Sequence, residues 1–439
     1  MTDNREIILE ALLLQDKGEF ADKIIKSVLD KYSYLERFER GFINRVFTGT
    51  IERKLTLDFL VNSFSSVKIN KQKPVIRAIL RMSVYQIMYM DSVPDSAAIN
   101  EAVKLAKKKK FQGLSGFVNG VLRKIAREKD NIVYPSRDKE PVRYLSVIYS
   151  CPEWLCEHFI SETDFDTAEK ILSVSLEERP LTVRVNLSKD SLDNVVNSLK
   201  DENVEITVDK ENAALTLSGV EGLRNLSSFE DGLFCVQDKS SQMILKSDEV
   251  IECIKNASLV VDVCAAPGGK TCHVSDLIKY YNNDSCEVVA RDLTDVKVDK
   301  IDENLDRCGF DFVSTEVRDA LDIDDSMINK ADLVIADLPC SGLGVIGRKV
   351  DIKYRVQQED LKSLPELQRD ILLVVSQYVK PGGILIYSTC TVNQLENSCN
   401  ASWIKNELGL EELPSPGQII NDTIDYDGFF IARFRKAMS

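Results

Sequence analysis

The segment 259–278 is the feature that most restricts the fold of this chain. A mostly apolar run, Leu259–Val263, is followed by small residues, a proline and two glycines, and then by helix-compatible sequence from Thr271 to Ile278. This pattern predicts a strand, a tight turn and the start of a helix. Glycines let a backbone approach a ligand closely, and a helix N-terminus offers unpaired N–H groups. In open α/β sheets, ligands bind beyond such carboxyl ends of strands.

Two common nucleotide-binding motifs do not match this turn. A P-loop needs a glycine at the position of Cys264, and the dinucleotide fingerprint needs a spacing that Gly268 and Gly269 do not provide. On this stretch alone, an ordinary strand-to-helix turn without a ligand is an equally good interpretation. The rest of the chain has to decide between the two.

Strands and helices alternate from about residue 231 onward. Strand candidates are Leu259–Val263, Glu287–Ala290, Leu333–Ala336 and Ile384–Tyr387, and helical periodicity covers Val296–Cys308 and Leu367–Val379. This alternation is typical of βαβ units and predicts an α/β domain of Rossmann-like architecture. Polar residues that could face a ligand follow three of these strands, namely Asp292, Asp337 and Ser388.

The part before residue 231 divides into two further regions. Residues 1 to about 135 have helical periodicity throughout, which predicts an all-α bundle. After a proline-punctuated connection, apolar and polar residues alternate over Leu181–Leu187, and a helical and a second strand pattern follow. We therefore expect three domains: a helical bundle (1–138), a small α/β module (139–230) and a larger α/β domain (231–439). Arg184 in the module could contact phosphate or face water, and the second interpretation is favoured.

Charge is distributed unevenly along the chain, although the total of −14 (pI ≈ 4.9) argues against nucleic acid as a partner. Residues 1–140 contain 26 basic and 18 acidic side chains, a charge of +8, whereas residues 141–439 contain 30 and 52, a charge of −22. A basic end on an acidic body fits a polyanionic partner held at that end. The run Lys107–Lys110 is equally well explained as a solvated helix end.

Histidine and cysteine usage bounds the metal chemistry and the compartment. The chain has two histidines and eleven cysteines, none of them in a C-x-x-C pair, so we expect no zinc site. Scattered thiols are typical of a reducing compartment. The first twenty residues lack a signal-peptide core and no apolar run reaches the length of a membrane span, so the sequence predicts a cytoplasmic protein without a membrane partner.

Two cysteines occupy matching positions just past predicted neighbouring strands. Cys340 lies in Asp-Leu-Pro-Cys-Ser-Gly and Cys390 in Tyr-Ser-Thr-Cys-Thr. A thiolate suits one problem in particular, because C5 of cytosine is too weak a nucleophile to attack a methyl sulfonium. Addition of a thiolate to C6 makes C5 reactive and divides one difficult step into two. A second group must then assist release of the thiolate after the C5 proton has left.

The N-terminal motifs resemble those of the antitermination factor NusB, whose helical bundle contacts RNA and protein partners. The matching stretches are Leu80–Gln86, Val93–Val103 and Gly116–Arg123. Over essentially its full length the chain resembles the RsmB (Sun/Fmu) family of ribosomal RNA cytosine-5 methyltransferases. That resemblance implies a NusB-like domain, a small RNA-binding module and a class I methyltransferase domain that uses S-adenosylmethionine.

The resemblance also implies roles for individual residues. Cys390 would be the nucleophile, Cys340 would assist product release, and Asp337 would contact both the cofactor side and the cytosine edge. Asp292 would hold the cofactor ribose, and Asp319 would meet the adenine. The cofactor turn would consist of Cys264, Ala265, Ala266, Pro267, Gly268, Gly269 and Lys270.

The chain departs from the family pattern at several positions. Arg291 precedes Asp292 where an apolar residue is more common, and Leu338 and Leu343 replace smaller or polar residues. None of these changes removes a predicted catalytic group.

We therefore expect an enzyme that methylates C5 of a cytosine in ribosomal RNA, in the small subunit (16S), as a monomer and without a metal. The first alternative is the same chemistry on transfer RNA. The second, from another class, is a non-catalytic RNA-binding or antitermination factor with a vestigial methyltransferase domain.

Overall fold

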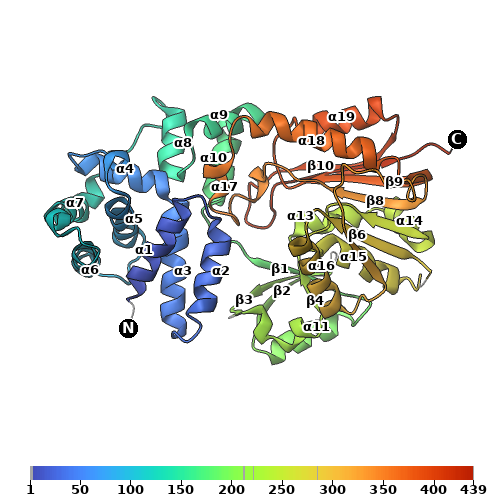
Figure 1. The fold of residues 1–439 in the computed structure, drawn as a ribbon, viewed down its shortest axis with the longest axis horizontal. Coiled ribbons are helices and arrows are strands. Elements are labelled where there is room, and N and C mark those ends of the chain that lie inside the picture. Colours follow the sequence, from blue (N-terminus) through green and yellow to red (C-terminus); the bar gives the residue numbers. More distant parts are fainter. Residues whose placement is uncertain (1–2, 211–212, 221, 284, 439) are drawn as a thin grey trace. The chain divides into compact units, whose positions relative to one another are not determined.

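The computed structural model describes residues 3–210, 213–220, 222–283 and 285–438 (Figure 1). The chain forms two compact units. The first comprises Met1–Leu176 together with Ile346–Arg355, and the second comprises Glu177–Val345 together with Val356–Ser439. The predicted domain boundaries at 138 and 230 therefore do not coincide with this division, and they stay a prediction.

The first unit is helical, as the periodicity of residues 1–135 predicts. Its elements are α1 (Asn4–Gln15), α2 (Ala21–Lys31), α3 (Arg37–Glu52), α4 (Lys54–Phe64), η1 (Ile69–Lys71), α5 (Pro74–Tyr89), α6 (Asp95–Lys108), η2 (Gln112–Leu114), α7 (Ser115–Glu128), η3 (Lys129–Asn131), α8 (Pro141–Tyr149), α9 (Glu153–Glu162), α10 (Phe165–Val174) and α17 (Ile352–Arg355).

Almost the whole surface of helix α5 is buried, which shows that this helix lies at the centre of the unit. Proline at the first helical position favours its start. Gly49 on α3 faces Tyr85, and a Cβ at that glycine would lie 2.1 Å from the tyrosine ring, so only glycine permits the close approach of α3 and α5. The buried Arg81 is neutralised by a bidentate ion pair with Asp58 at 2.7 and 2.8 Å.

The segment 346–355 is anchored in the first unit by polar contacts. The carboxylate of Asp351 accepts a hydrogen bond from the backbone N–H of Ala21 at 3.1 Å, and the hydroxyl of Tyr354 donates to the carbonyl of Ser150 at 2.8 Å. Burial lowers the pKa of Lys353 to about 8, and its ammonium donates to the carbonyl of Tyr149. These residues therefore hold the end of the segment against the helices of this unit.

The run Lys107–Lys110 is partly used inside the first unit. Lys108 and Lys109 form ion pairs with Glu6 at 2.7 and 2.8 Å, and Lys109 also pairs with Glu10. These contacts connect the end of α6 to α1. Two of the four lysines therefore have acidic partners within this unit.

The second unit begins with a four-stranded antiparallel sheet in the order β2-β3-β1-β4. Its elements are β1 (Leu181–Val185), α11 (Leu192–Asp201), β2 (Glu205–Asp209), β3 (Ala214–Ser218), η4 (Leu223–Asn225), α12 (Ser227–Glu230) and β4 (Phe234–Val236). One face of β1 packs on α11 through Val183, Val185 and Leu199. Arg184 points to the other face, where it is buried and pairs with Asp276 at 2.7 Å. The prediction that Arg184 faces water is therefore wrong.

The larger sheet has seven strands in the order β10-β11-β9-β8-β5-β6-β7. The run from β9 to β7 is parallel, and β11 and β10 are added antiparallel. The strands are β5 (Leu259–Asp262), β6 (Glu287–Asp292), β7 (Val313–Val317), β8 (Ala331–Asp337), β9 (Val379–Thr389), β10 (Glu411–Ile419) and β11 (Phe429–Arg435). The helices are α13 (Lys239–Gln242), η5 (Met243–Leu245), α14 (Asp248–Asn256), α15 (Gly269–Tyr280), α16 (Asp295–Cys308), η6 (Leu343–Val345), α18 (Asp360–Val375) and α19 (Ser398–Glu407).

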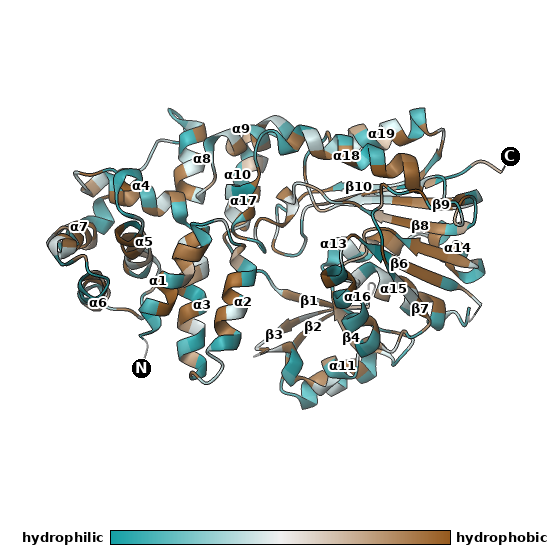
Figure 2. Ribbon diagram, viewed as in Figure 1, coloured by the Kyte–Doolittle hydropathy of each residue, from teal (hydrophilic) through white to brown (hydrophobic). Residues whose placement is uncertain are grey.

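Apolar strands explain why this sheet is covered on both faces. Figure 2 shows β6, β8 and β9 as hydrophobic ribbons, which is typical of parallel strands that are buried on both sides. One core contains Val261, Val334 and Leu385, and the other contains Val260, Leu333 and Ile384. The predicted α/β architecture is confirmed.

One predicted helix needs a correction. Helix α18 ends at Val375, and Val379 already begins β9, whereas the periodicity predicted a helix over Leu367–Val379. The apolar run continues from the helix into the strand, and periodicity alone cannot locate the boundary between them. None of the described helices is long and apolar enough to cross a membrane.

Candidate functional site

The carboxyl ends of β8 and β9 bring two sulfur atoms together. The two strands are neighbours in the parallel sheet, and Asp337 at the end of β8 is in register with Ser388 near the end of β9. Cys340 and Cys390 follow these strand ends, and their Sγ atoms are 3.3 Å apart. Neither cysteine is in a disulfide and both are half-buried, so this edge of the sheet holds two neighbouring thiols within reach of a ligand.

The two thiols do not ionise independently. The neighbouring Cys390 thiol, together with burial and the charges of Glu396 and Asp337, raises the pKa of Cys340 well above its ordinary value. A like charge so close disfavours a second negative charge. At neutral pH Cys340 therefore keeps its proton.

A buried carboxylate fixes the two loops that carry these thiols. Glu396 accepts hydrogen bonds from the backbone N–H of Ser341 at 2.9 Å and from its hydroxyl. That hydroxyl is also 2.7 Å from the hydroxyl of Thr391. Ser341 and Thr391 directly follow the two cysteines, so Glu396 ties the two loops together. Gln368 and Asn393 each donate a further hydrogen bond to Glu396 at 3.0 Å.

Sequence reasoning did not identify Glu396. It lies in a polar stretch, 393–397, six residues after Cys390, and nothing in its spacing separates it from surface residues. Complete burial of an acidic side chain is the signal, and burial is visible only in the folded chain.

Asp337 connects the thiol pair to the predicted cofactor turn. One of its carboxylate oxygens is 2.5 Å from the ammonium of Lys270, and the other accepts from the hydroxyl of Ser388 at 2.7 Å. Although burial acts against the charge of Lys270, the Asp337 carboxylate raises the pKa of that ammonium. Lys270 also lies 5.3 Å from the ring centre of Phe429. A fixed cation therefore stands between the turn and the two sulfurs.

The turn itself has the predicted strand-turn-helix geometry. Gly268 has φ = +102°, and a Cβ there would lie 3.3 Å from Cα of Ile301, so a side chain is disfavoured twice over. Helix α15 starts at the next residue, and Thr271 in its first turn donates to the buried Asp262 at 2.7 Å. Burial raises the pKa of Cys264 to about 12, so this thiol stays neutral.

The two acidic residues assigned to the nucleoside differ in their surroundings. Asp292 is buried at the end of β6, accepts from the backbone N–H of Ala266 at 2.9 Å, and pairs with the half-exposed Lys297 at 2.7 Å. Asp319, beyond β7, is half-buried and accepts from the backbone N–H of Leu321. Asp292 is therefore directly bonded to the turn, whereas Asp319 closes a local turn of its own.

Arg291, the departure from the family pattern, is accommodated by two carboxylates. Its buried guanidinium pairs with Glu316 at 2.8 Å and with Asp324 at 2.6 Å, and it lies 5.9 Å from the ring centre of Tyr378. The positive charge of Arg291 is thus compensated by Glu316 and Asp324, and the neighbouring Asp292 keeps its hydrogen bond to Ala266.

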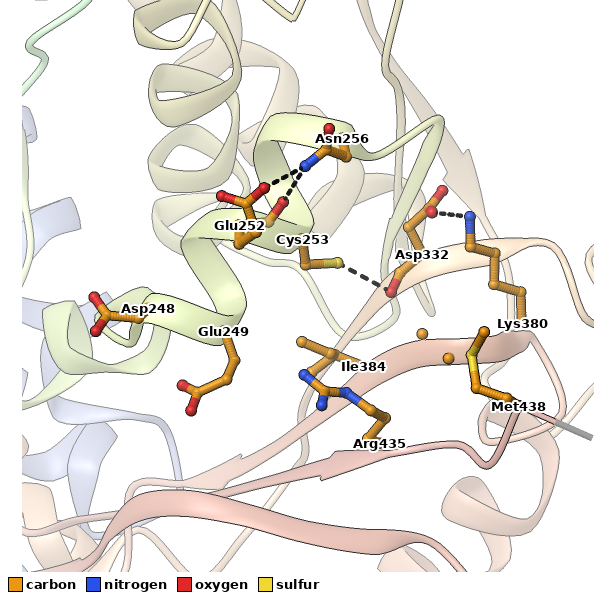
Figure 3. A pocket seen from close by; sticks show the side chains of 12 residues that line it. Asp248, Glu249, Glu252, Cys253, Asn256, Asp332, Lys380, Ile384, Arg435 and Met438 are labelled. Atoms are coloured by element: carbon orange, nitrogen blue, oxygen red, sulfur yellow. Dashed lines mark hydrogen bonds and ion pairs between the residues drawn. The ribbon is translucent and has the colours of Figure 1, made fainter.

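A separate pocket of about 700 Å³ lies at the amino-terminal ends of the strands (Figure 3). It contains the ion pair between Asp332 at the start of β8 and Lys380 at the start of β9, and Cys253, whose thiol donates to the carbonyl of Asp332. Ligands of open α/β sheets bind at the opposite, carboxyl edge. The pocket is therefore distinct from the thiol site, and we assign it no function.

The mostly parallel seven-stranded sheet with its glycine turn and strand-end carboxylates defines the class, a Rossmann-like methyltransferase domain. Three family profiles match the chain: "16S rRNA methyltransferase RsmB/F" over residues 251–435, "NusB family" over 2–127, and the ferredoxin-like domain of RsmF/B-like methyltransferases over 151–220. Together with the relatives described next, these matches show that the chain belongs to the RsmB/F methyltransferase family.

Two curated relatives cover almost the whole chain. "Probable ribosomal RNA small subunit methyltransferase B" from Bacillus subtilis is 36% identical over 99% of this chain and 99% of its own. The relative of the same name from Synechocystis sp. is 31% identical over 98% and 99%.

The fold also matches solved structures. The crystal structure of PH0851 aligns with a TM-score of 0.79 at 24% identity over 99% of both chains. A methyltransferase homolog protein from Pyrococcus horikoshii aligns with a TM-score of 0.57 at 24% identity over 67% of this chain and 99% of its own. The predicted family and fold class are confirmed.

Proposed function

We propose that this protein transfers a methyl group from S-adenosylmethionine to C5 of a cytosine in small-subunit ribosomal RNA, through a covalent bond between Cys390 and C6. The observation that carries the proposal is the pair of sulfurs 3.3 Å apart at the carboxyl edge of the sheet. Membership of the RsmB/F family supports small-subunit ribosomal RNA as the substrate. A relative that matches almost the whole chain is named "Probable ribosomal RNA small subunit methyltransferase B".

The residues of the turn fit the proposed methyl donor. Gly268 gives the turn its left-handed backbone and its close packing on Ile301, and the N–H groups at the start of α15, which directly follows the turn, suit an anionic or polar ligand group. Asp292 supports the turn through Ala266 and would accept from ribose hydroxyls if Lys297 moves away. When bound, S-adenosylmethionine supplies an electrophilic methyl group on its sulfonium.

Cys390 begins the reaction as a thiolate that adds to C6 of the cytosine. The new carbon–sulfur bond makes C5 electron-rich, so that C5 would take up the methyl group while the bond from that group to the donor sulfur breaks and the donor leaves as a neutral thioether. Asp337 and Lys270 lie at the same edge, where they can hydrogen-bond the polar edge of the base. The base has to leave its stack to reach them, at a cost of a few kcal/mol that is smallest in loops.

Cys340 acts in the second half of the reaction. The neighbouring Cys390 is the main cause of its raised pKa, and bond formation at C6 removes that negative neighbour. Cys340, which is half-buried, can then release its proton to the solvent and, as a thiolate, accept the proton from C5. The electron pair of the C5–H bond restores the ring double bond, the C6–sulfur bond breaks, and Cys390 leaves as a thiolate.

The experiment supplies the purified protein with labelled S-adenosylmethionine and small-subunit RNA, either stripped or as small-subunit particles. We expect label in 5-methylcytidine after digestion to nucleosides. Bisulfite sequencing of total RNA from cells with and without the protein then locates the base. A position in transfer RNA would overturn the substrate, and failure to bind S-adenosylmethionine in calorimetry would overturn the enzymatic function altogether.

A further inference from the structure

A second group of thiols meets inside the second unit, away from the pair described above. It consists of Cys235 in β4, Cys272 in the first turns of α15 and Cys308 at the end of α16, hereafter the three-thiol cluster. Their Sγ atoms all lie within 4.8 Å of one another, and those of Cys235 and Cys308 are 3.4 Å apart. All three side chains are buried.

Two polar side chains direct N–H groups at these sulfurs. The amide nitrogen of Asn186 is 3.5 Å from Sγ of Cys308 and 3.7 Å from Sγ of Cys235. Arg184 donates to the amide oxygen of Asn186 at 2.7 Å, and the amide nitrogen, which donates to the carbonyl of Gly232 at 2.7 Å, is held on the side of the sulfurs. Arg307 brings Nη2 to 3.9 Å from Sγ of Cys235. Donors of this kind are typical of the groups that surround metal-bound thiolates.

We propose that the three-thiol cluster binds one thiophilic metal ion, and that this ion is Zn²⁺. Zinc–sulfur bonds of about 2.3 Å at tetrahedral angles place sulfurs roughly 3.8 Å apart, so shifts of less than about 1 Å bring the three sulfurs into range. Binding replaces three S–H protons by a divalent cation and leaves one negative charge. The guanidinium of Arg307 compensates it, whereas Arg184 is already neutralised by Asp276.

The competing explanation is that the cysteines only fill an apolar core. Ala265, Ala290 and Leu305 do pack around them, and buried cysteines commonly serve as small hydrophobic residues. A core role does not require N–H donors directed at the sulfurs. A metal role also has a structural consequence, because Cys272 lies three residues after the start of α15. The ion would join β4, α15 and α16 directly behind the cofactor turn.

The first experiment uses the full-length protein, reduced and stripped of metal, and titrates it with Co²⁺. We expect sulfur-to-cobalt charge-transfer bands that saturate at one equivalent and are displaced by Zn²⁺. Zn²⁺ should also raise the melting temperature by several degrees, because it binds only the folded chain. Absence of the bands, or an unchanged melting temperature, would overturn the proposal.

Variants locate the ion. Cys235→Ser and Cys308→Ser should each lose the bands, whereas the matched control Cys399→Ser, a half-buried cysteine on α19, should keep them. If a variant does not fold, alkylation of the wild-type chain in mild denaturant decides, because Zn²⁺ should protect the peptides of Cys235, Cys272 and Cys308 beyond the protection that burial gives them in the metal-free chain. Protection of Cys340 and Cys390 instead would place the ion in the other pair and refute the assignment. None of these readouts depends on methyl transfer.

Discussion

The two groups of sulfur atoms in the second unit have similar spacing but different surroundings. Cys340 and Cys390 are half-buried at the carboxyl edge of the sheet, beside a lysine and an aspartate. The three-thiol cluster packs against apolar residues and meets the side-chain amide of Asn186 and the guanidinium of Arg307. The comparison teaches that exposure and neighbouring groups, rather than the spacing of thiols, decide which chemistry is open to them. One pair can meet a nucleobase, whereas the other group can take up only a small ion.

The largest effect is expected from Cys390→Ala. Loss of the nucleophile should lower methyl transfer by at least about 10³-fold, because C5 is then never activated. Binding of S-adenosylmethionine, measured by calorimetry, should change little. Cys399→Ala is the matched control and should keep full activity. Comparable activity in Cys390→Ala would contradict the assigned role and break the contrast between the two groups.

Cys340→Ala should separate the two halves of the reaction. Methylation proceeds to the covalent stage but release is blocked, so turnover falls about 10²-fold while a protein–RNA adduct survives denaturing gel electrophoresis. The double variant with Cys390→Ala should form no adduct. An adduct that forms through Cys340 and disappears in the single Cys340 variant would reverse the two roles.

Asp262→Asn tests how burial shifts the titration of an acidic side chain. Asp262 ends β5, the strand that leads into the turn 264–270. Burial raises the pKa of Asp262 to about 7 from its ordinary value of 3.8. A raised folded-state pKa means that its contribution to stability is complete at low pH and is lost as pH rises through about 7. Between pH 5 and pH 8 the loss is about 2.5 kcal/mol.

The asparagine cannot ionise, so the variant should lose less stability than the wild type between pH 5 and pH 8. Denaturant unfolding of both proteins at the two pH values measures the difference. Equal pH dependence in the two proteins would show that Asp262 is not the titrating group. The exposed Glu407→Gln on α19 is a control that should leave the pH dependence unchanged.

Glu396→Gln should have the smallest effect, and it tests how the loops of Cys340 and Cys390 are held together. The carboxylate accepts from four donors, whereas the amide of glutamine would direct an N–H group at one of them. We expect about tenfold lower turnover with partial adduct accumulation and unchanged affinity for S-adenosylmethionine. Glu407→Gln serves as the control again. A loss of folding without any change in the adduct fraction would reduce Glu396 to a structural residue.

Much of the fold and part of the site could be predicted because local patterns encode them. Apolar runs, glycine turns and helical periodicity located β5, β6, β8 and α15. Cys340 and Cys390 each follow a strand, and neighbouring parallel strands end at the same edge, so their approach could be expected from the motifs. The boundary between α18 and β9 could not, because one apolar run serves both elements.

The amino-acid sequence by itself determined the alternation of helices and strands and the strand-turn-helix segment, because these depend on short-range patterns. It also determined the family, because the residues of several motifs match those of the family. Only the tertiary structure decided that Arg184 is buried against Asp276, that Glu396 links the loops that carry Cys340 and Cys390, and that Cys235, Cys272 and Cys308 meet. The expectation of no metal rested on the missing C-x-x-C spacing and on the presence of only two histidines, whereas the proposed cluster predicts that the chain binds one metal ion. The physical reason is that burial and contact between residues tens of positions apart arise from packing, which no local pattern records.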